Sequence, residues 1–477
     1  MIKINHTLQS LFFFSVTIFL YLLKDFFSPL VIYFLLNITL LFNVLFYIIK
    51  LSKKYKRGFL LNPLVISLVI NFLFFHGGIT YFLLYEDYQP LSDVNSNINL
   101  NNVFYAKSGF LINMALIIMV FGYFSKIASN FNKFILNIYK RFSYREIIIK
   151  PIPLFLLICV VYIIKLYLLY NGLFGRLGEH DSALANKLAF LSNFTLIPIL
   201  FSSYNFFKYN RTKLLFYCCL ILELFFSFLE GARAPILSLS VLVFLVYYYT
   251  KNSISFKSIF YGLCVFIITF TVVTDFKSYI KNNTISDFSI SGILTGYFNN
   301  MSSTKDYNFQ EFKTTSFGRL NVVSELASAV QYKDIVGLKK TDPDFKKSFM
   351  LVPIQIFIPN SLLGIKNYSF GDWFRFDVLK RGDIFQIYNV AFSPIGFLYL
   401  SGGYIYVIVG FFFYGFLLKS IENLPKIGFI GFVLFILLGS FIFQYKTNIP
   451  ANLISFIRFL ILLPVIFTIL RLFKFTK

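Results

Sequence analysis

One short segment combines residue types that could bind a phosphate-bearing substrate. The stretch FLEGARAPIL, residues 228–237, ends one apolar block at Glu230 and begins the next near Ala234, with only Gly-Ala-Arg between them. This places Arg233 at a predicted membrane boundary. Because arginine keeps its charge and offers a planar fork of N–H donors, it can bind diphosphate oxygens bidentately. The other interpretation is that Arg233 only reaches toward the headgroups or pairs with Glu230.

A few other side chains have the type and setting of functional groups. His180, in RLGEHDS, lies in a short connection between apolar blocks. Histidine titrates near neutral pH, which suits a general base, and a solvated loop histidine is the alternative. Four ionisable residues lie within or at the ends of apolar blocks: Lys165, Glu223, Asp275 and Arg458. Such residues are costly in lipid, so they usually face the interior of a helix bundle and mark a site, although Lys165 and Arg458 could reach the interface instead.

The short motifs of soluble enzymes are absent from the sequence, which has no GxxxxGK[ST], HExxH or GxGxxG. Asp342-Pro343-Asp344 has the Asp-x-Asp spacing by which many nucleotide-sugar enzymes hold a divalent metal, but a proline-centred turn is the favoured interpretation. The four cysteines all lie in apolar blocks, without zinc-site spacing or a disulfide framework. We therefore expect no metal and no other cofactor.

The composition points to a membrane protein. Hydrophobic residues make up 57% of the 477 residues and charged residues only 14%, against about 25% charged in a soluble domain. The apolar residues come in blocks long enough to cross a bilayer, which takes about 20 residues of helix. Because no water satisfies the backbone there, each block must be helical. The blocks are approximately 7–23, 29–49, 59–84, 107–125, 151–170, 189–207, 214–230, 235–250, 258–275, 391–418, 427–443 and 452–470.

The charges of the connecting segments alternate from one connection to the next. Half of the basic residues fall in every second connection, in groups such as Lys50 to Arg57 and Lys126 to Lys150, where the only acidic residues are Glu146 and Glu422. The positive-inside rule places these connections and both termini in the cytoplasm. About half of the basic residues are thus topology signals, so the net charge of +23 does not indicate a nucleic-acid partner. We expect an all-α, multi-pass protein of the cytoplasmic (inner) membrane with about twelve spans.

The three predicted parts are a bundle of nine helices over residues 1–275, a large outer loop over 276–390, and three further helices over 391–477. Within the loop, residues 319–332 show apolar spacing typical of an amphipathic helix. Residues 348–363 are apolar but too short to span and contain two prolines, so a re-entrant or interfacial segment is favoured. Trp373, with its neighbouring phenylalanines, is predicted at headgroup level. The loop should therefore lie against the membrane.

Three segments resemble the bacterial O-antigen and surface-polysaccharide repeat-unit polymerases, which include the enterobacterial common antigen polymerase. FLEGARAPIL, 228–237, resembles the Gly-x-Arg turn of that family, and IFIPNSLLGIKNYSF, 356–370, its Phe-Ile-Pro stretch followed by a basic residue. AFSPIGFLYLSGGYIYVIVGFFFYG, 391–415, resembles its Ser-Pro and Gly-rich entry into the helix after the loop. Weaker similarities lie at 170–177 and 319–325, and the single large late loop matches as well, so the resemblance covers most of the chain.

The resemblance implies a glycosyltransferase that polymerises repeat units carried on undecaprenyl diphosphate. A hydroxyl of a new lipid-linked unit attacks the anomeric carbon of the growing glycan, and the lipid diphosphate leaves. Such a site needs cationic donors for the charge that grows on the leaving group. The candidates for contacts with diphosphate and glycan are Arg176, Arg233, Arg319, Lys366 and Arg375. The candidates for a general base are His180, Glu325, Asp372 and Asp377.

Two other functions remain open. An O-antigen ligase would break the same donor bond, but a resemblance to that family would imply an outer loop with a functional histidine. Residues 276–390 contain no histidine. A flippase or polysaccharide transporter would be expected to show matched halves, whereas nine predicted helices precede the loop and three follow it. The implied partners are the lipid-linked oligosaccharide, membrane lipid and, for a polymerase, a chain-length regulator and a flippase.

Overall fold

The structure is a computed structural model of the whole chain. It describes residues 6–84, 102–140, 150–170, 196–229, 233–251, 322–339, 342–358, 370–378, 393–443, 449–450, 452–458 and 460–461. Over these ranges the regular elements are all helices, without a strand. The chain divides into two compact units: unit 1 is Met1–Arg145 with Lys313–Thr468, and unit 2 is Glu146–Phe312 with Ile469–Lys477.

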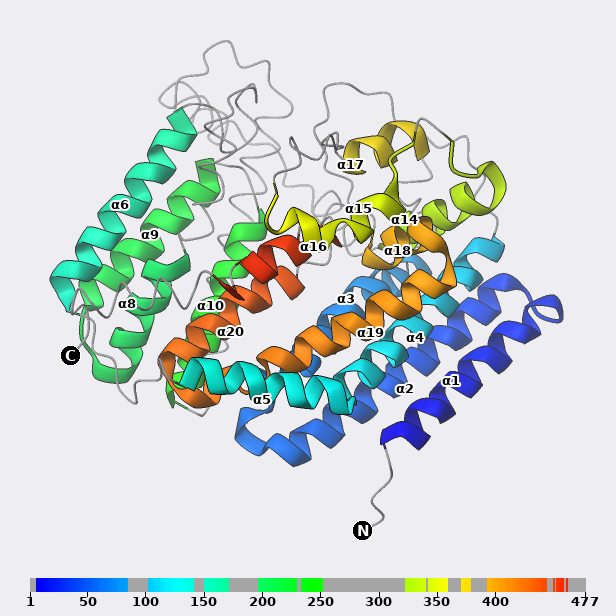
Figure 1. The fold of residues 1–477 in the computed structure, drawn as a ribbon, viewed down its shortest axis with the longest axis horizontal. Coiled ribbons are helices and arrows are strands. Elements are labelled where there is room, and N and C mark those ends of the chain that lie inside the picture. Colours follow the sequence, from blue (N-terminus) through cyan, green and yellow to red (C-terminus); the bar gives the residue numbers. More distant parts are fainter. Residues whose placement is uncertain are drawn as a thin grey trace. The chain divides into compact units, whose positions relative to one another are not determined.

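Unit 1 is a bundle of long apolar helices (Figure 1). Its helices are α1 (His6–Leu22), α2 (Pro29–Tyr55), α3 (Pro63–Leu84), α4 (Asn102–Phe124), α5 (Lys126–Lys140), α18 (Pro394–Gly402), α19 (Tyr404–Ile421) and α20 (Phe429–Phe443), and residues 449–450, 452–458 and 460–461 are also helical. Short 3-10 turns follow α1 (η1, Leu23–Asp25), α2 (η2, Lys56–Leu61) and α19 (η7, Leu424–Ile427).

Helices α4 and α19 lie side by side although nearly 300 residues separate them in the chain (Figure 1). Their backbones approach closely at two glycines. A Cβ atom at Gly415 would overlap the carbonyl oxygen of Met119, and one at Gly122 would overlap that of Phe412. Small residues at such crossings are a common way for membrane helices to pack, because lipid offers them no hydrophobic driving force.

The described helices confirm a membrane-embedded all-α protein. Four segments are long and apolar enough to cross a bilayer: Leu8–Asp25, Pro29–Tyr55, Val103–Phe124 and Tyr404–Ile427. Shorter apolar helices cover Pro63–Phe75, Pro151–Tyr167, Leu239–Lys251 and Phe429–Ser440. Of the predicted blocks, 258–275 lies wholly outside the described residues, so the number twelve stays a prediction.

The ends of the unit 1 helices form two separate sets of contacts, at opposite ends of the bundle, which is consistent with the alternation of charge along the sequence. At one end the Tyr55 hydroxyl donates to Glu422, and the Asn62 amide donates to the Tyr123 hydroxyl at 2.9 Å. All four residues lie in or next to connections that are predicted to be cytoplasmic. At the opposite ends, Tyr21 of α1 stacks on Phe110 of α4 at 4.4 Å between ring centroids. The contacts distinguish the two ends of the bundle, and which end faces the cytoplasm remains a prediction.

The block predicted at 391–418 is two helices instead of one. Ser393 caps α18 by accepting a hydrogen bond from the Gly396 N–H at 3.1 Å, and Pro394 occupies the first turn. Gly403 then ends α18 with φ of +72°, a conformation that favours glycine. The chain turns there and α19 begins at Tyr404. The hydropathy of residues 391–418 does not predict this turn, and the only signal in the sequence is the Gly-Gly pair at 402–403.

Part of the predicted outer loop is folded and packs on the other helices of unit 1. We call residues 322–339, 342–358 and 370–378 the cover. It contains α14 (Val322–Gln331), the π-helix η5 (Tyr332–Val336), α15 (Phe345–Met350), α16 (Val352–Gln355), α17 (Phe370–Trp373) and the π-helix η6 (Phe374–Val378). Figure 1 shows α14 and α15 against α18. Helix α14 lies within residues 319–332, where the amphipathic helix was predicted, and the short helices α15 and α16 overlap residues 348–363.

Unit 2 has four described helices. They are α6 (Pro151–Tyr170), α8 (Leu196–Tyr209), α9 (Lys213–Leu229) and α10 (Arg233–Lys251). Helix α8 contacts each of the other three. The turn from α8 to α9 uses two residues with positive φ, Asn210 at 53° and Thr212 at 56°.

Candidate functional site

The cover is organised around one half-buried carboxylate, that of Asp342. Asp342 accepts hydrogen bonds from the Tyr332 hydroxyl at 2.9 Å, from the Trp373 indole N–H at 3.1 Å and from the Lys339 backbone N–H at 2.8 Å. Burial raises the pKa of Tyr332, and its bond to the Asp342 carboxylate raises it further. Asp344 caps α15 by accepting from the Lys347 N–H at 2.8 Å. Both aspartates of the Asp-Pro-Asp motif therefore shape the cover, in agreement with the turn interpretation.

Trp373 is a correction to the sequence prediction. It was expected at headgroup level, but only 8% of its surface is exposed. Its ring meets Tyr332 edge-on at 5.5 Å and Phe345 at 5.0 Å. Phe345 in turn contacts Phe397 of α18 at 5.4 Å. The indole N–H has an acceptor inside the cover, Asp342, so the side chain has no need of the interface.

A second contact joins the cover to the bundle. Asp334 of η5 pairs with Lys107 of α4 and accepts a hydrogen bond from the Tyr399 hydroxyl of α18 at 2.7 Å. Lys333 donates to the carbonyls of Tyr399 and Leu400, the latter at 3.3 Å, near the C-terminal end of α18. Desolvation lowers the pKa of Lys333, while the negative charge of Asp334 opposes that shift.

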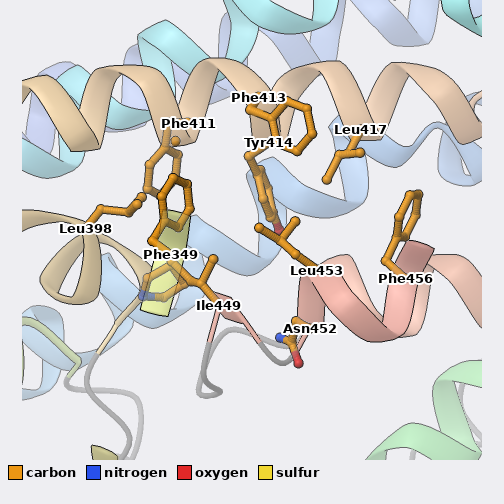
Figure 2. A pocket seen from close by; sticks show the side chains of 12 residues that line it. Phe349, Leu398, Phe411, Phe413, Tyr414, Leu417, Ile449, Asn452, Leu453 and Phe456 are labelled. Carbon is orange, nitrogen blue, oxygen red and sulfur yellow. The ribbon is translucent and has the colours of Figure 1, made fainter. Parts of the chain in front are cut away.

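An apolar groove lies between the cover and the helices after it (Figure 2). Its cavity volume is about 50 Å³. Aromatic and aliphatic side chains form nearly all of its wall, with one amide, Asn452, and one phenol, Tyr414. It is lined by Phe349, Pro394, Leu398, Gly410, Phe411, Phe413, Tyr414, Leu417, Ile449, Asn452, Leu453 and Phe456. Such a lining suits a hydrocarbon chain better than a sugar.

The groove opens onto the apolar surface of α19. Phe413 lines the groove and is also 39% exposed, and Val409 on the same helix is 56% exposed. In a membrane-embedded protein these exposed side chains face lipid, because α19 lies in a candidate span. The groove therefore lies next to an apolar surface of this candidate span.

Arg458 fixes the far wall of the groove to the cover. It lies on the same segment as Asn452, Leu453 and Phe456. Its guanidinium donates to the carbonyl of Gln355 at 2.7 Å and to that of Ile356 at 3.1 Å, at the C-terminal end of α16. The sequence interpretation left Arg458 as a site marker or an interface residue. The structure instead gives it a positioning role beside the groove.

Unit 2 contains a buried ion pair. Lys165 of α6 and Glu223 of α9 lie 3.0 Å apart, with side chains 5% and 9% exposed. The Tyr162 hydroxyl donates to the other Glu223 oxygen at 3.0 Å, and the Lys165 ammonium lies 4.9 Å from the centre of the Phe226 ring. The expectation that Glu223 faces the bundle interior is confirmed, and Lys165, for which the interface was left open, is buried beside it.

The candidate site residues fall mostly beyond what the structure describes. Glu325 lies in the first turn of α14 and is half-buried, and Asp377 of η6 is exposed. Asp372 and Arg375 lie in α17 and η6, and Arg233 is the first residue of α10, but their side chains are not described. Arg176, His180, Arg319 and Lys366 lie outside the described residues. No contact among these nine candidates is seen in the described part of the chain.

Sequence reasoning missed the residues that join the cover to the bundle. Lys107 was assigned only as a charge in a connection, and Lys333 and Asp334 were part of the mixed charge of the loop. The nearest signal was the position of Lys333 and Asp334 directly after the predicted helix at 319–332. No model of a known protein family, no curated protein and no solved structure matches this chain.

Proposed function

We propose that this protein is a membrane glycosyltransferase that polymerises lipid-linked oligosaccharide repeat units, as its resemblance to the O-antigen and surface-polysaccharide polymerases implies. The observation that carries the proposal is the apolar groove between the cover and α19. A lipid-linked glycan has a hydrocarbon tail and a polar head, so its enzyme needs a lipid-accessible groove next to a folded polar segment. The groove and the cover of unit 1 support the proposal because they match these two requirements.

In the proposed reaction the hydroxyl of a newly arrived unit attacks the anomeric carbon of the growing glycan. A bond forms between that oxygen and the anomeric carbon, and the bond from the anomeric carbon to the diphosphate oxygen breaks. The hydroxyl proton passes to a base, and undecaprenyl diphosphate leaves with the bonding electrons. Cationic donors that bind the departing diphosphate favour the transition state, because its negative charge grows as the bond breaks.

The residues proposed for these roles are those of the sequence analysis. Arg233, Arg176, Arg319, Arg375 and Lys366 are the candidates for binding diphosphate and glycan. Asp377 is the candidate base that the structure describes as exposed on the cover, and Asp372, Glu325 and His180 are the others. Of the nine, Arg233 has the most specific setting, because it is the first residue of α10 and so lies at a helix N-terminus, where anions are favoured.

An Arg233→Ala variant tests this role. Expressed at the normal level in the native cell, it should leave single repeat units on the lipid carrier instead of long chains. Arg211→Ala is the matched control, since Arg211 is an exposed arginine in the turn between α8 and α9. The control should make polymer of normal length. Full-length polymer from the Arg233→Ala strain would remove Arg233 from the site.

A further inference from the structure

Helix α5 turns out of the bundle where the α4 span ends. Ser125 separates the two helices, donating to the Gly122 carbonyl at 2.8 Å and accepting from the Ala128 N–H at 3.1 Å. The 15 residues of α5 are about 22 Å long at 1.5 Å per residue, which is too short to cross a bilayer. The turn holds α5 at the level of the helix end, and therefore near a membrane surface.

One side of α5 packs on the bundle. Ala128, Asn132, Ile135 and Tyr139 are buried at helical spacing. The Asn132 amide donates to the carbonyls of Lys419 and Ser420, the latter at 3.2 Å, at the end of α19. The Tyr139 hydroxyl donates to the carbonyl of Leu460 at 2.8 Å. The orientation of the helix about its own axis is thereby fixed.

A second side of α5 is apolar but uncovered. Ile127 is 69% exposed and Phe134 is 58% exposed. Phe131 and Ile138 are half-buried and continue the same stripe, since residues four and seven apart share one face of a helix. A soluble surface has no reason to expose such a stripe, whereas a helix in the membrane interface buries it among acyl chains.

The remaining side of α5 is basic. Lys126, Lys133 and Lys140 are exposed and lie two helical turns apart from one another, with Asn130 and Asn137 beside them. Helix α5 contains no acidic residue. The helix therefore presents three faces in order around its axis: one packed on protein, one apolar and one positively charged.

We propose that α5 is a binding surface for anionic phospholipid headgroups. The apolar stripe enters the acyl region, and the lysines contact the phosphates at the surface of the same leaflet. The charge complementarity selects anionic over zwitterionic lipid. A basic residue near an anionic surface strengthens binding by about 1 kcal/mol, or about fivefold, so loss of two lysines weakens it by about 25-fold.

A lipid titration of the purified full-length protein tests this proposal. Its thermal unfolding is followed in detergent with increasing phosphatidylglycerol or, in parallel, phosphatidylcholine. Phosphatidylglycerol should stabilise the wild-type protein more than phosphatidylcholine does. The Lys126→Gln/Lys133→Gln variant should need about 25-fold more phosphatidylglycerol for the same shift. Lys126→Arg/Lys133→Arg should respond like the wild type.

The matched control is Lys346→Gln/Lys347→Gln, which removes two exposed lysines from α15 in the cover. It should keep the wild-type response. An unchanged response of the Lys126/Lys133 glutamine variant would overturn the proposal. So would an equal loss in the control, or a wild-type protein that does not distinguish the two lipids.

Discussion

Asp334 pairs with Lys107 although 227 positions separate them in the chain, and the pair joins the cover to α4. Its other carboxylate oxygen accepts from the Tyr399 hydroxyl at 2.7 Å. One side chain thus connects the predicted outer loop with helices from both halves of unit 1. The position of the cover beside the groove depends on contacts of this kind.

Asp334→Asn should loosen the cover. The substitution keeps the size of the side chain but removes the charge that pairs with Lys107, which costs about 1–3 kcal/mol for a hydrogen bond between charged groups. Hydrogen exchange should rise in α14 and η5 while α2 is unchanged. Lys339→Gln, at an exposed position of the cover, is the control. Unchanged exchange in α14 would show that the pair does not hold the cover.

Trp373 is the only tryptophan of the chain, so its fluorescence reports on the cover alone. Because the ring is buried against Tyr332 and Phe345, emission should be blue-shifted and resist both aqueous quenchers and brominated lipids. Asp342→Asn should shift the emission, since Asp342 accepts the indole N–H. Strong quenching by brominated lipid in the wild type would instead place Trp373 in the interface.

The ion pair of unit 2 should be costly to break from one side. Lys165→Met leaves the Glu223 carboxylate buried without its cation, which should destabilise the protein by about 3–5 kcal/mol. The Lys165→Met/Glu223→Gln double variant removes both charges and should recover much of that loss. Unfolding of detergent-solubilised protein measures the difference. Equal stability of the single and double variants would mean that the two charges are not coupled.

Filling the groove should impair polymerisation without unfolding the protein. Leu453→Trp places a larger ring in the space where the proposed lipid tail lies. We expect shorter polymer, or a higher requirement for lipid-linked substrate, at normal expression. Ile461→Trp, on an exposed side of the same segment, should behave like the wild type. Normal polymer from Leu453→Trp would separate the groove from the reaction.

Hydropathy and charge were enough to predict the membrane helices and the alternation of their ends. Long apolar blocks indicated the helices because backbone groups in lipid must bond within the helix, and the contacts of Tyr55, Tyr123 and Glu422 at one end fit the charge alternation. The buried position of Glu223 also followed, because an unpaired charge is costly in an apolar helix, whereas the interface had been left open for Lys165. These features depend on local composition.

The features that the sequence did not predict depend on contacts between residues that are far apart in the chain. The turn at Gly403, the burial of Trp373 and the pairing of Lys107 with Asp334 all arise from the packing of α18 and the cover. A single sequence contains no signal for which acceptor an indole finds, or which carboxylate a lysine meets. The groove is a product of the same packing, so its lining could not be predicted either.

The lipid-linked glycans of a deletion strain test the proposed function most directly. If the protein is a polymerase, the deletion strain should accumulate single repeat units on undecaprenyl diphosphate at the outer face, and the wild-type gene should restore long chains. Long polymer retained on its lipid carrier would indicate a ligase instead. Repeat units confined to the cytoplasmic face would indicate a flippase, and either of these two results would contradict the polymerase account.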